Sequence, residues 1–224
     1  MKHFIRKSAL GQEPSLEHFD NSILPELESL YAALLPSLEK GRLFIYIGST
    51  SRSEGTSTIA WALAYYIAVR TGEDCLYVDG NIRHPYVRRL EGLPENGLSD
   101  FLQGSVDFRM LPFPTELGRL AAVHGGRIRS SHVSLSAERA RQFVAESRRY
   151  YRATIFDSLP GFDKYAEIWS RHSDTVFIVT SYRRTKQEIL ERVLNGFRNA
   201  GISISGILFN KREFPIPDFL YRRL

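Results

Sequence analysis

A loop of small and polar residues between two apolar runs holds the residues best suited to chemistry. Residues 50–57 read TSRSEGTS, after an apolar run rich in β-formers and before a longer run with helical character. Phosphate-binding loops follow the pattern G-x-x-x-x-G-K-[ST], because small residues let successive backbone N–H groups close around an anion at a helix N-terminus. Gly55 and Ser57 fit this pattern, whereas Thr50 and Thr56 stand where it has Gly and Lys.

The missing lysine changes what this loop can do. A lysine would neutralise the β and γ phosphates, and losing one such preorganised donor costs about 3 kcal/mol of transition-state stabilisation. The backbone donors could still hold a nucleotide, and Arg52 is a candidate substitute cation. The alternative is a plain strand-to-helix turn capped by Ser53 or Ser57. The candidate nucleotide-binding residues in this segment are Arg52, Ser53, Glu54, Gly55, Thr56, Ser57 and Thr58.

Two aspartates follow apolar strands further along the chain. Asp79 comes after residues 75–78, and Asp157 comes after residues 153–156. Carboxylate oxygens are ligands that suit Mg²⁺, which takes its other ligands from phosphates and water. We therefore interpret both aspartates as candidate catalytic residues and, together with Ser57, as candidate metal ligands. The alternative is that they cap helices or hydrogen-bond within loops.

Expected strands and helices alternate along most of the chain. This alternation predicts an α/β fold with a mainly parallel sheet sandwiched by helices, and a ligand site at the carboxyl ends of the strands. Pro36 is expected to end or bend the first helix. The expected strands are 43–47, 75–78, 120–123, 153–156, 175–179 and 204–209, and the expected helices are 24–38, 59–69, 97–102, 137–150 and 185–199.

Length and composition limit the class of protein. The 224 residues predict one domain over residues 23–211, with a flexible leader over 1–22 and a tail over 212–224. The longest apolar stretch is far shorter than the ~20 residues of a spanning helix, so direct membrane insertion is not expected. The single Cys75 and the missing signal pattern favour the cytoplasm. The net charge of +5 is scattered, so nucleic acid is not an expected partner.

Several segments, taken in order, resemble the cytoplasmic domain of bacterial tyrosine kinases. These are P-loop proteins of capsule and exopolysaccharide export, related to the MinD and ParA ATPases. The resemblance covers residues 42–211, about three quarters of the chain. Its motifs are the S-x-x-x-x-E-G-K-S-T loop at 49–58, D-x-D-x-R-x-P at 79–85, G-L-S-D-x-L-x-G at 97–104, the D-T-P-P strand end at 157–160, S-D-x-V at 173–176 and G-x-x-x-x-G-x-x-x-N at 201–210.

The resemblance implies ligands and partners. It implies ATP or ADP with Mg²⁺, an expectation that Thr56 weakens, and a contact between Asn210 and the adenine. Lys211 and Arg212 are expected at the surface. The implied partner is a membrane polysaccharide co-polymerase or another export-complex protein, which would recruit this chain to the inner face of the membrane. Homo-oligomers are also implied.

Departures from the family pattern bear on activity. Thr56 replaces the lysine, Asn81 replaces the second aspartate of D-x-D, and 158–159 reads Ser-Leu in place of Thr-Pro. Tyr221 is the only tyrosine of the final segment, and residues 28–34 lack both arginines of the family's E-x-x-R-x-x-R assembly motif. The leading hypothesis is a degenerate, kinase-like regulatory or scaffold partner in exopolysaccharide biosynthesis or export. The alternatives are an active ATPase or tyrosine autokinase with an altered loop, and a ParA/MinD-like positioning ATPase.

Overall fold

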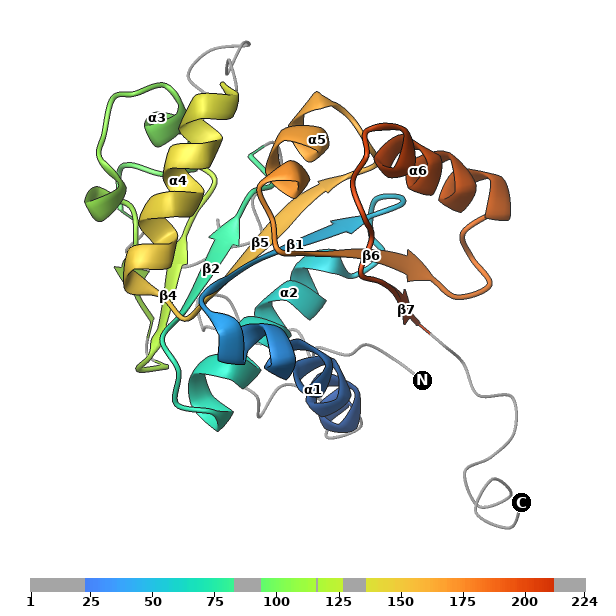
Figure 1. The fold of residues 1–224 in the computed structure, drawn as a ribbon, viewed down its shortest axis with the longest axis horizontal. Coiled ribbons are helices and arrows are strands. Elements are labelled where there is room, and N and C mark those ends of the chain that lie inside the picture. The colour runs from blue at the N-terminus through green and yellow to red at the C-terminus, as the bar shows by residue number, and fades with distance from the viewer. Residues whose placement is uncertain (1–22, 83–93, 116, 127–135, 212–224) are drawn as a thin grey trace.

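A twisted seven-stranded sheet runs through the centre of the molecule (Figure 1). The computed structural model describes residues 23–82, 94–115, 117–126 and 136–211. The strand order is β3-β4-β2-β5-β1-β6-β7, and every pairing is parallel except that of β3 with β4. The strands are β1 (Leu43–Ser49), β2 (Cys75–Asp79), β3 (Phe113–Pro114), β4 (Leu120–Val123), β5 (Ala153–Pro160), β6 (Thr175–Ser181) and β7 (Gly206–Asn210).

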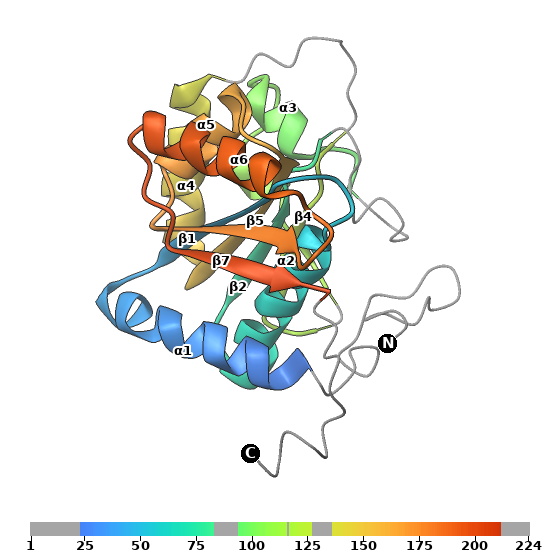
Figure 2. The ribbon, with the colours of Figure 1, turned by 90° about the vertical axis from the view of Figure 1, so that its right-hand side faces the viewer.

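Helices cover both faces of this sheet (Figure 2). The helices α1 and α2 pack on one face, and α4, α5 and α6 pack on the other. The expected α/β fold with a mainly parallel, helix-sandwiched sheet is confirmed. The helices are α1 (Leu24–Lys40), α2 (Thr56–Tyr65) with a π-turn at Tyr66–Arg70, α3 (Leu98–Leu102), a 3₁₀ turn at Phe108–Met110, α4 (Ala137–Tyr150), α5 (Lys164–Arg171) and α6 (Gln187–Asn199).

The central strands are apolar on both faces, as expected for a covered parallel sheet. Every residue of β1 is buried: Ile45 and its alternate neighbours face α1 and α2, whereas Phe44 faces α4 and α5. Phe156 of β5 stacks on Trp169 of α5 with ring centroids 4.3 Å apart.

The structure differs from the sequence-based expectation in three elements. Pro36 lies inside α1 without ending it, because the helix continues to Lys40 with Leu34 and Leu38 buried on either side of the proline. The eight-residue helix α5 was not predicted, and the short antiparallel β3 was not predicted either. No helix of the described residues is long and apolar enough to cross a bilayer. The predicted leader and tail lie outside the described residues, so the domain limits stay a prediction.

Candidate phosphate-binding site

Three of the predicted segments meet at one edge of the sheet. In the strand registers, Asp157 of β5 lies opposite Asp79 of β2 on one side and Ile47 of β1 on the other. The loop at 50–55 leaves β1 at this same edge and leads into α2. The structure therefore brings the loop and both aspartates to the carboxyl ends of adjacent strands, where ligands of open α/β sheets bind.

The loop turns twice through the left-handed region before α2 begins. Ser53 has φ of 62° and Gly55 has φ of 89°. A Cβ added to Gly55 would lie 2.2 Å from Nδ2 of Asn210, so the position needs glycine for both conformation and space. Gly55 is the N-cap residue of α2, and no side chain caps this helix. The predicted cap by Ser53 or Ser57 is therefore wrong, and whether the loop binds a nucleotide stays a prediction.

Glu54 holds the loop in shape from within. Its carboxylate is 3% exposed and accepts hydrogen bonds from the backbone N–H groups of Thr50 (2.9 Å) and Ser51 (3.0 Å). It also accepts from the hydroxyls of Thr50 (2.6 Å) and Thr185 (2.5 Å), the latter in the connection between β6 and α6. We predicted Glu54 as a nucleotide-binding residue, but its carboxylate faces the loop's own donors. Glu54 therefore holds the loop backbone in place.

Neither the residue at position 56, where the family pattern has lysine, nor Arg52 reproduces a phosphate-binding lysine. Thr56 is buried at the first position of α2 and carries a hydroxyl in place of an ammonium. Arg52 is exposed, and in the described part of the chain no hydrogen bond or ion pair directs its guanidinium into the loop. Ser53 is exposed as well, and Thr58 lies in the first turn of α2.

Asp157 is a buried carboxyl with a strongly shifted pKa. It is 1% exposed, and burial raises its pKa to about 7, although hydrogen bonds from Ser57 and Tyr77 lower it. The Tyr77 hydroxyl donates to Oδ2 at 2.8 Å, whereas Oδ1 is buried without a hydrogen-bond partner. Ser57 and Asp157 are thus brought together, and the unpartnered oxygen fits a hard cation. Mg²⁺ bound there would supply positive charge to a phosphate.

Asp79 lies beside Asp157 in the sheet and is also fully buried. Its Oδ1 accepts a hydrogen bond from the backbone N–H of Asn81 at 3.2 Å. This contact is the loop hydrogen bond that the alternative interpretation allowed, and it leaves the proposed catalytic role as a prediction. The end of the D-x-D-x-R-x-P segment, with Arg83 and Pro85, lies outside the described residues.

Asn210 and Lys211 reach the loop from the end of β7. Asn210 donates from Nδ2 to the carbonyl of Glu54 at 2.7 Å, and Lys211 donates from Nζ to the carbonyl of Ser53. Lys211 lies near the surface as expected, with an exposed contact to the loop that the sequence did not predict. The adenine contact of Asn210 stays a prediction. Nothing in the local sequence indicates these contacts, which depend on β7 being brought to the loop through β6.

Comparisons with known proteins bear on this arrangement. No protein-family model matches the chain. It is 22% identical over 200 residues to the tyrosine-protein kinase Ptk of Acinetobacter johnsonii. That match covers 88% of this chain and 27% of the relative. The resemblance to bacterial tyrosine kinases is confirmed. Because the chain spans about a quarter of this kinase, the activity of the whole relative does not transfer to it.

Solved structures of bacterial tyrosine kinases share the fold. The chimerical protein CapA2B2 matches with a TM-score of 0.77 and 21% identity, over 92% of this chain and 93% of that one. The kinase domain of the Escherichia coli tyrosine kinase ETK matches with a TM-score of 0.75 and 17% identity, over 95% and 86% of the two chains.

The fold extends to a nucleotide-bound relative of another kind. The septum site-determining protein MinD from Pyrococcus horikoshii, solved with Mg-ADP, matches with a TM-score of 0.60 and 16% identity. The match covers 81% of this chain and 76% of that one. The P-loop NTPase-like fold class is therefore confirmed.

Proposed function

We propose that this chain is a degenerate member of the kinase-like group that acts in bacterial exopolysaccharide biosynthesis or export. It serves as a regulatory or scaffold partner of a membrane polysaccharide co-polymerase, which recruits it to the inner face of the membrane. The observation that carries the proposal is Thr56, which is buried at the start of α2 where the family pattern has its phosphate-binding lysine.

The electrostatics of the site support this proposal. Phosphoryl transfer depends on positive charge and a metal ion that stabilise the transferred group. Here the loop encloses the carboxylate of Glu54, and the Tyr77 hydroxyl already occupies one oxygen of Asp157. Burial raises the pKa of the Asp157 carboxyl, which opposes the ionised form that a metal ion needs. The site keeps its shape and lacks the charge that rapid transfer needs.

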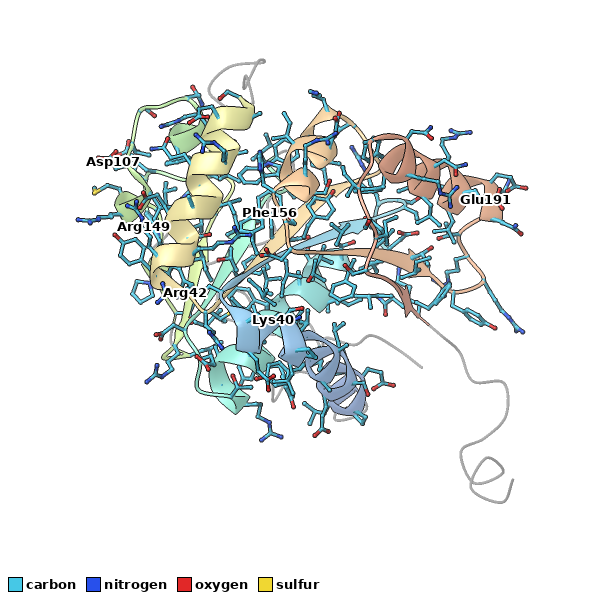
Figure 3. All side chains as sticks on the ribbon, in the orientation of Figure 1. Lys40, Arg42, Asp107, Arg149, Phe156 and Glu191 are labelled. Atoms are coloured by element: carbon cyan, nitrogen blue, oxygen red, sulfur yellow. The ribbon has the colours of Figure 1, made fainter. Side chains whose placement is uncertain are left out.

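A genetic experiment tests the scaffold role. In a strain that lacks this chain, we expect the wild type and Asp157→Asn to restore exopolysaccharide output equally. The matched control is Asp107→Asn, which makes the same change at an exposed carboxylate outside this edge (Figure 3). Failure of Asp157→Asn to restore output, at normal protein level and with Asp107→Asn active, would contradict a role without catalysis.

One observation favours an active ATPase or autokinase as a second candidate. Ser57 and Asp157 lie together, and Oδ1 of Asp157 is buried without a hydrogen-bond partner, which suits a metal ion. An enzyme of this kind would need Asp79 and Asp157 for turnover. Hydrolysis of ATP that both Asp79→Ala and Asp157→Asn abolish would favour this candidate over the scaffold.

A further inference from the structure

Two consecutive residues at the end of β7 hold two consecutive carbonyl groups of the loop. Lys211 donates from its ammonium to the carbonyl of Ser53, and Asn210 donates from its side-chain amide to the carbonyl of Glu54 at 2.7 Å. These contacts join segments more than 150 residues apart in the sequence. The end of β7 is therefore a structural part of the loop.

The backbone of β7 aims Lys211 at this position. Asn210 pairs with Ser181 of β6, and its carbonyl accepts from the N–H of Tyr182 at 2.8 Å. The Asn210 side chain accepts from the N–H of Lys211 at 2.8 Å, and Lys211 has φ of 58°. A left-handed conformation costs a non-glycine residue about 1 kcal/mol, so the surrounding contacts must maintain it.

The contacts with the carbonyls determine where the loop's donors point. In a planar trans peptide the C=O and N–H point in opposite directions. Since the carbonyls of Ser53 and Glu54 face the end of β7, the N–H groups of Glu54 and Gly55 face away from it. An ammonium on the carbonyl side adds to the field of these peptide dipoles and raises their affinity for an anion. Lys211 thus acts on the anion through the loop.

Other features of the same site also point to a ligand. The start of α2 has no side-chain cap, which leaves its first N–H groups available to an anion. Oδ1 of Asp157 is buried and has no hydrogen-bond partner, and this carboxyl is hydrogen-bonded to Ser57 in the first turn of α2. A phosphate carrying a divalent cation would satisfy both sets of groups.

We propose that Lys211 supplies the positive charge with which this loop binds the diphosphate or triphosphate of a nucleotide, in place of a lysine at position 56. It is a positioning residue, because it acts through the peptide units of Ser53 and Glu54. The inference rests on the proposed function in one respect, because it assumes that the site binds a nucleotide without rapid turnover. Arg52 is exposed, and no hydrogen bond or ion pair among the described residues joins its guanidinium to the loop. Lys211 is therefore the cation that the described structure bonds to the loop.

Calorimetric binding of ADP in the presence of Mg²⁺ tests this role on the full chain. We expect Lys211→Gln, which keeps a hydrogen-bond donor and removes the charge, to weaken ADP binding about tenfold, the scale of one unit charge beside a partly buried anion. Lys211→Arg should stay within about twofold of the wild type. The matched control is Lys40→Gln at the C-terminal end of α1, before β1 (Figure 3), and it should leave the affinity unchanged.

A double variant separates charge from structure. If Lys211 replaces the missing lysine, Thr56→Lys should restore ADP affinity in the Lys211→Gln background. Wild-type affinity in Lys211→Gln would overturn the inference, and so would loss of binding that Thr56→Lys does not restore. If Lys211→Gln lowers Tm, the ADP affinities are compared at a temperature at which the wild type and both variants are folded.

The two proposals fail in different ways. A wild-type chain that binds no ADP would overturn the role of Lys211 and leave the scaffold role standing. Rapid ATP turnover that requires Lys211 would overturn the scaffold role and leave the role of Lys211 standing.

Discussion

Two adjacent strands, β1 and β5, lead into helices whose starts are built in opposite ways. After β5, the Asp163 side chain accepts a hydrogen bond from the N–H of Ala166 at 2.9 Å and closes the first turn of α5. After β1, Gly55 stands in the left-handed region and no side chain caps α2. The strands themselves are joined by parallel pairing, and the N–H of Gly161 donates to the carbonyl of Ser49 at 2.8 Å.

The difference lies in how the first N–H groups of the two helices are satisfied. A helix leaves its first N–H groups without internal partners, and a capping side chain is the usual remedy. The start of α5 satisfies one such group with its own carboxylate. The loop before α2 directs its carboxylate, Glu54, back to Thr50 and Ser51, away from the helix. The first N–H groups of α2 therefore receive no side-chain cap, which the proposed binding of an anion requires.

Gly55→Ala should produce the largest loss of stability and break the open start of α2. The new Cβ would meet Asn210 in addition to the strain of a positive φ, so we expect a loss of about 3 kcal/mol in the free energy of unfolding. The control is Gly72→Ala, where φ is 70° and no atom lies within 4 Å of an added Cβ; it should cost about 1 kcal/mol. Urea unfolding measures both. Equal losses would show that Asn210 does not restrict position 55.

Asp157→Asn should stabilise the chain, because the site holds a buried carboxyl that prefers to be neutral. Its folded pKa of about 7 lies above the unfolded value, so the wild type loses stability as pH rises from about 4 to 7. We expect a gain of about 2 kcal/mol at pH 8 and little change at pH 4. Urea unfolding at the two pH values measures this, with Asp107→Asn as the control. A loss at pH 8 would contradict the assigned cost of burial.

Asp163→Ala tests the closed start of α5. Removal of the capping carboxylate should cost about 1 kcal/mol of stability, measured by thermal unfolding. Ser53→Ala in the loop before α2 should stay within about 0.5 kcal/mol, because this hydroxyl does not cap α2. If the two substitutions cost the same, the two helix starts do not differ as described.

The smallest expected effect lies at the other end of α5, where His172 is the C-cap residue. Burial, followed by Arg141, Arg171 and Arg148, lowers its pKa below the usual value, and Glu138 opposes this. Since the folded pKa is depressed, the contribution to stability is present above about pH 6.5 and is lost as pH falls. The wild type should lose no more than about 1 °C in Tm relative to His172→Gln between pH 7.5 and 5.5, because solvent screens this half-exposed ring. A rise in the Tm of the wild type relative to His172→Gln at pH 5.5 would contradict the lowered pKa of His172.

The sequence was sufficient to predict the elements that carry the site. The apolar runs have the lengths of strands and helices, and a small or polar residue such as Gly48 or Asp157 follows the strand-length runs, so the alternation follows from local pattern. The resemblance to bacterial tyrosine kinases depended on motifs in the same order. By contrast, α5 has only eight residues, too few for a clear helical period.

The contacts inside the site could not be predicted in this way. Glu54 reaches Thr185, and Lys211 reaches Ser53, only because β1, β6 and β7 are neighbours in the sheet. Alternation of strands and helices does not specify that order. The hydrogen bond from Tyr77 to Asp157 also crosses between strands, and a tyrosine in an apolar run gives no indication of its partner. Side-chain pairing across a sheet depends on register, which local sequence leaves open.

The most direct test of the account measures binding and turnover on the same wild-type sample. Mg²⁺-dependent ADP binding is followed by calorimetry, and then phosphate release and phosphotyrosine at Tyr221 are followed with ATP. The account predicts ADP binding with no phosphate release above that of Asp157→Asn and no phosphotyrosine. Sustained phosphate release or phosphorylation of Tyr221 that Asp157→Asn abolishes would contradict it and identify the chain as an active enzyme.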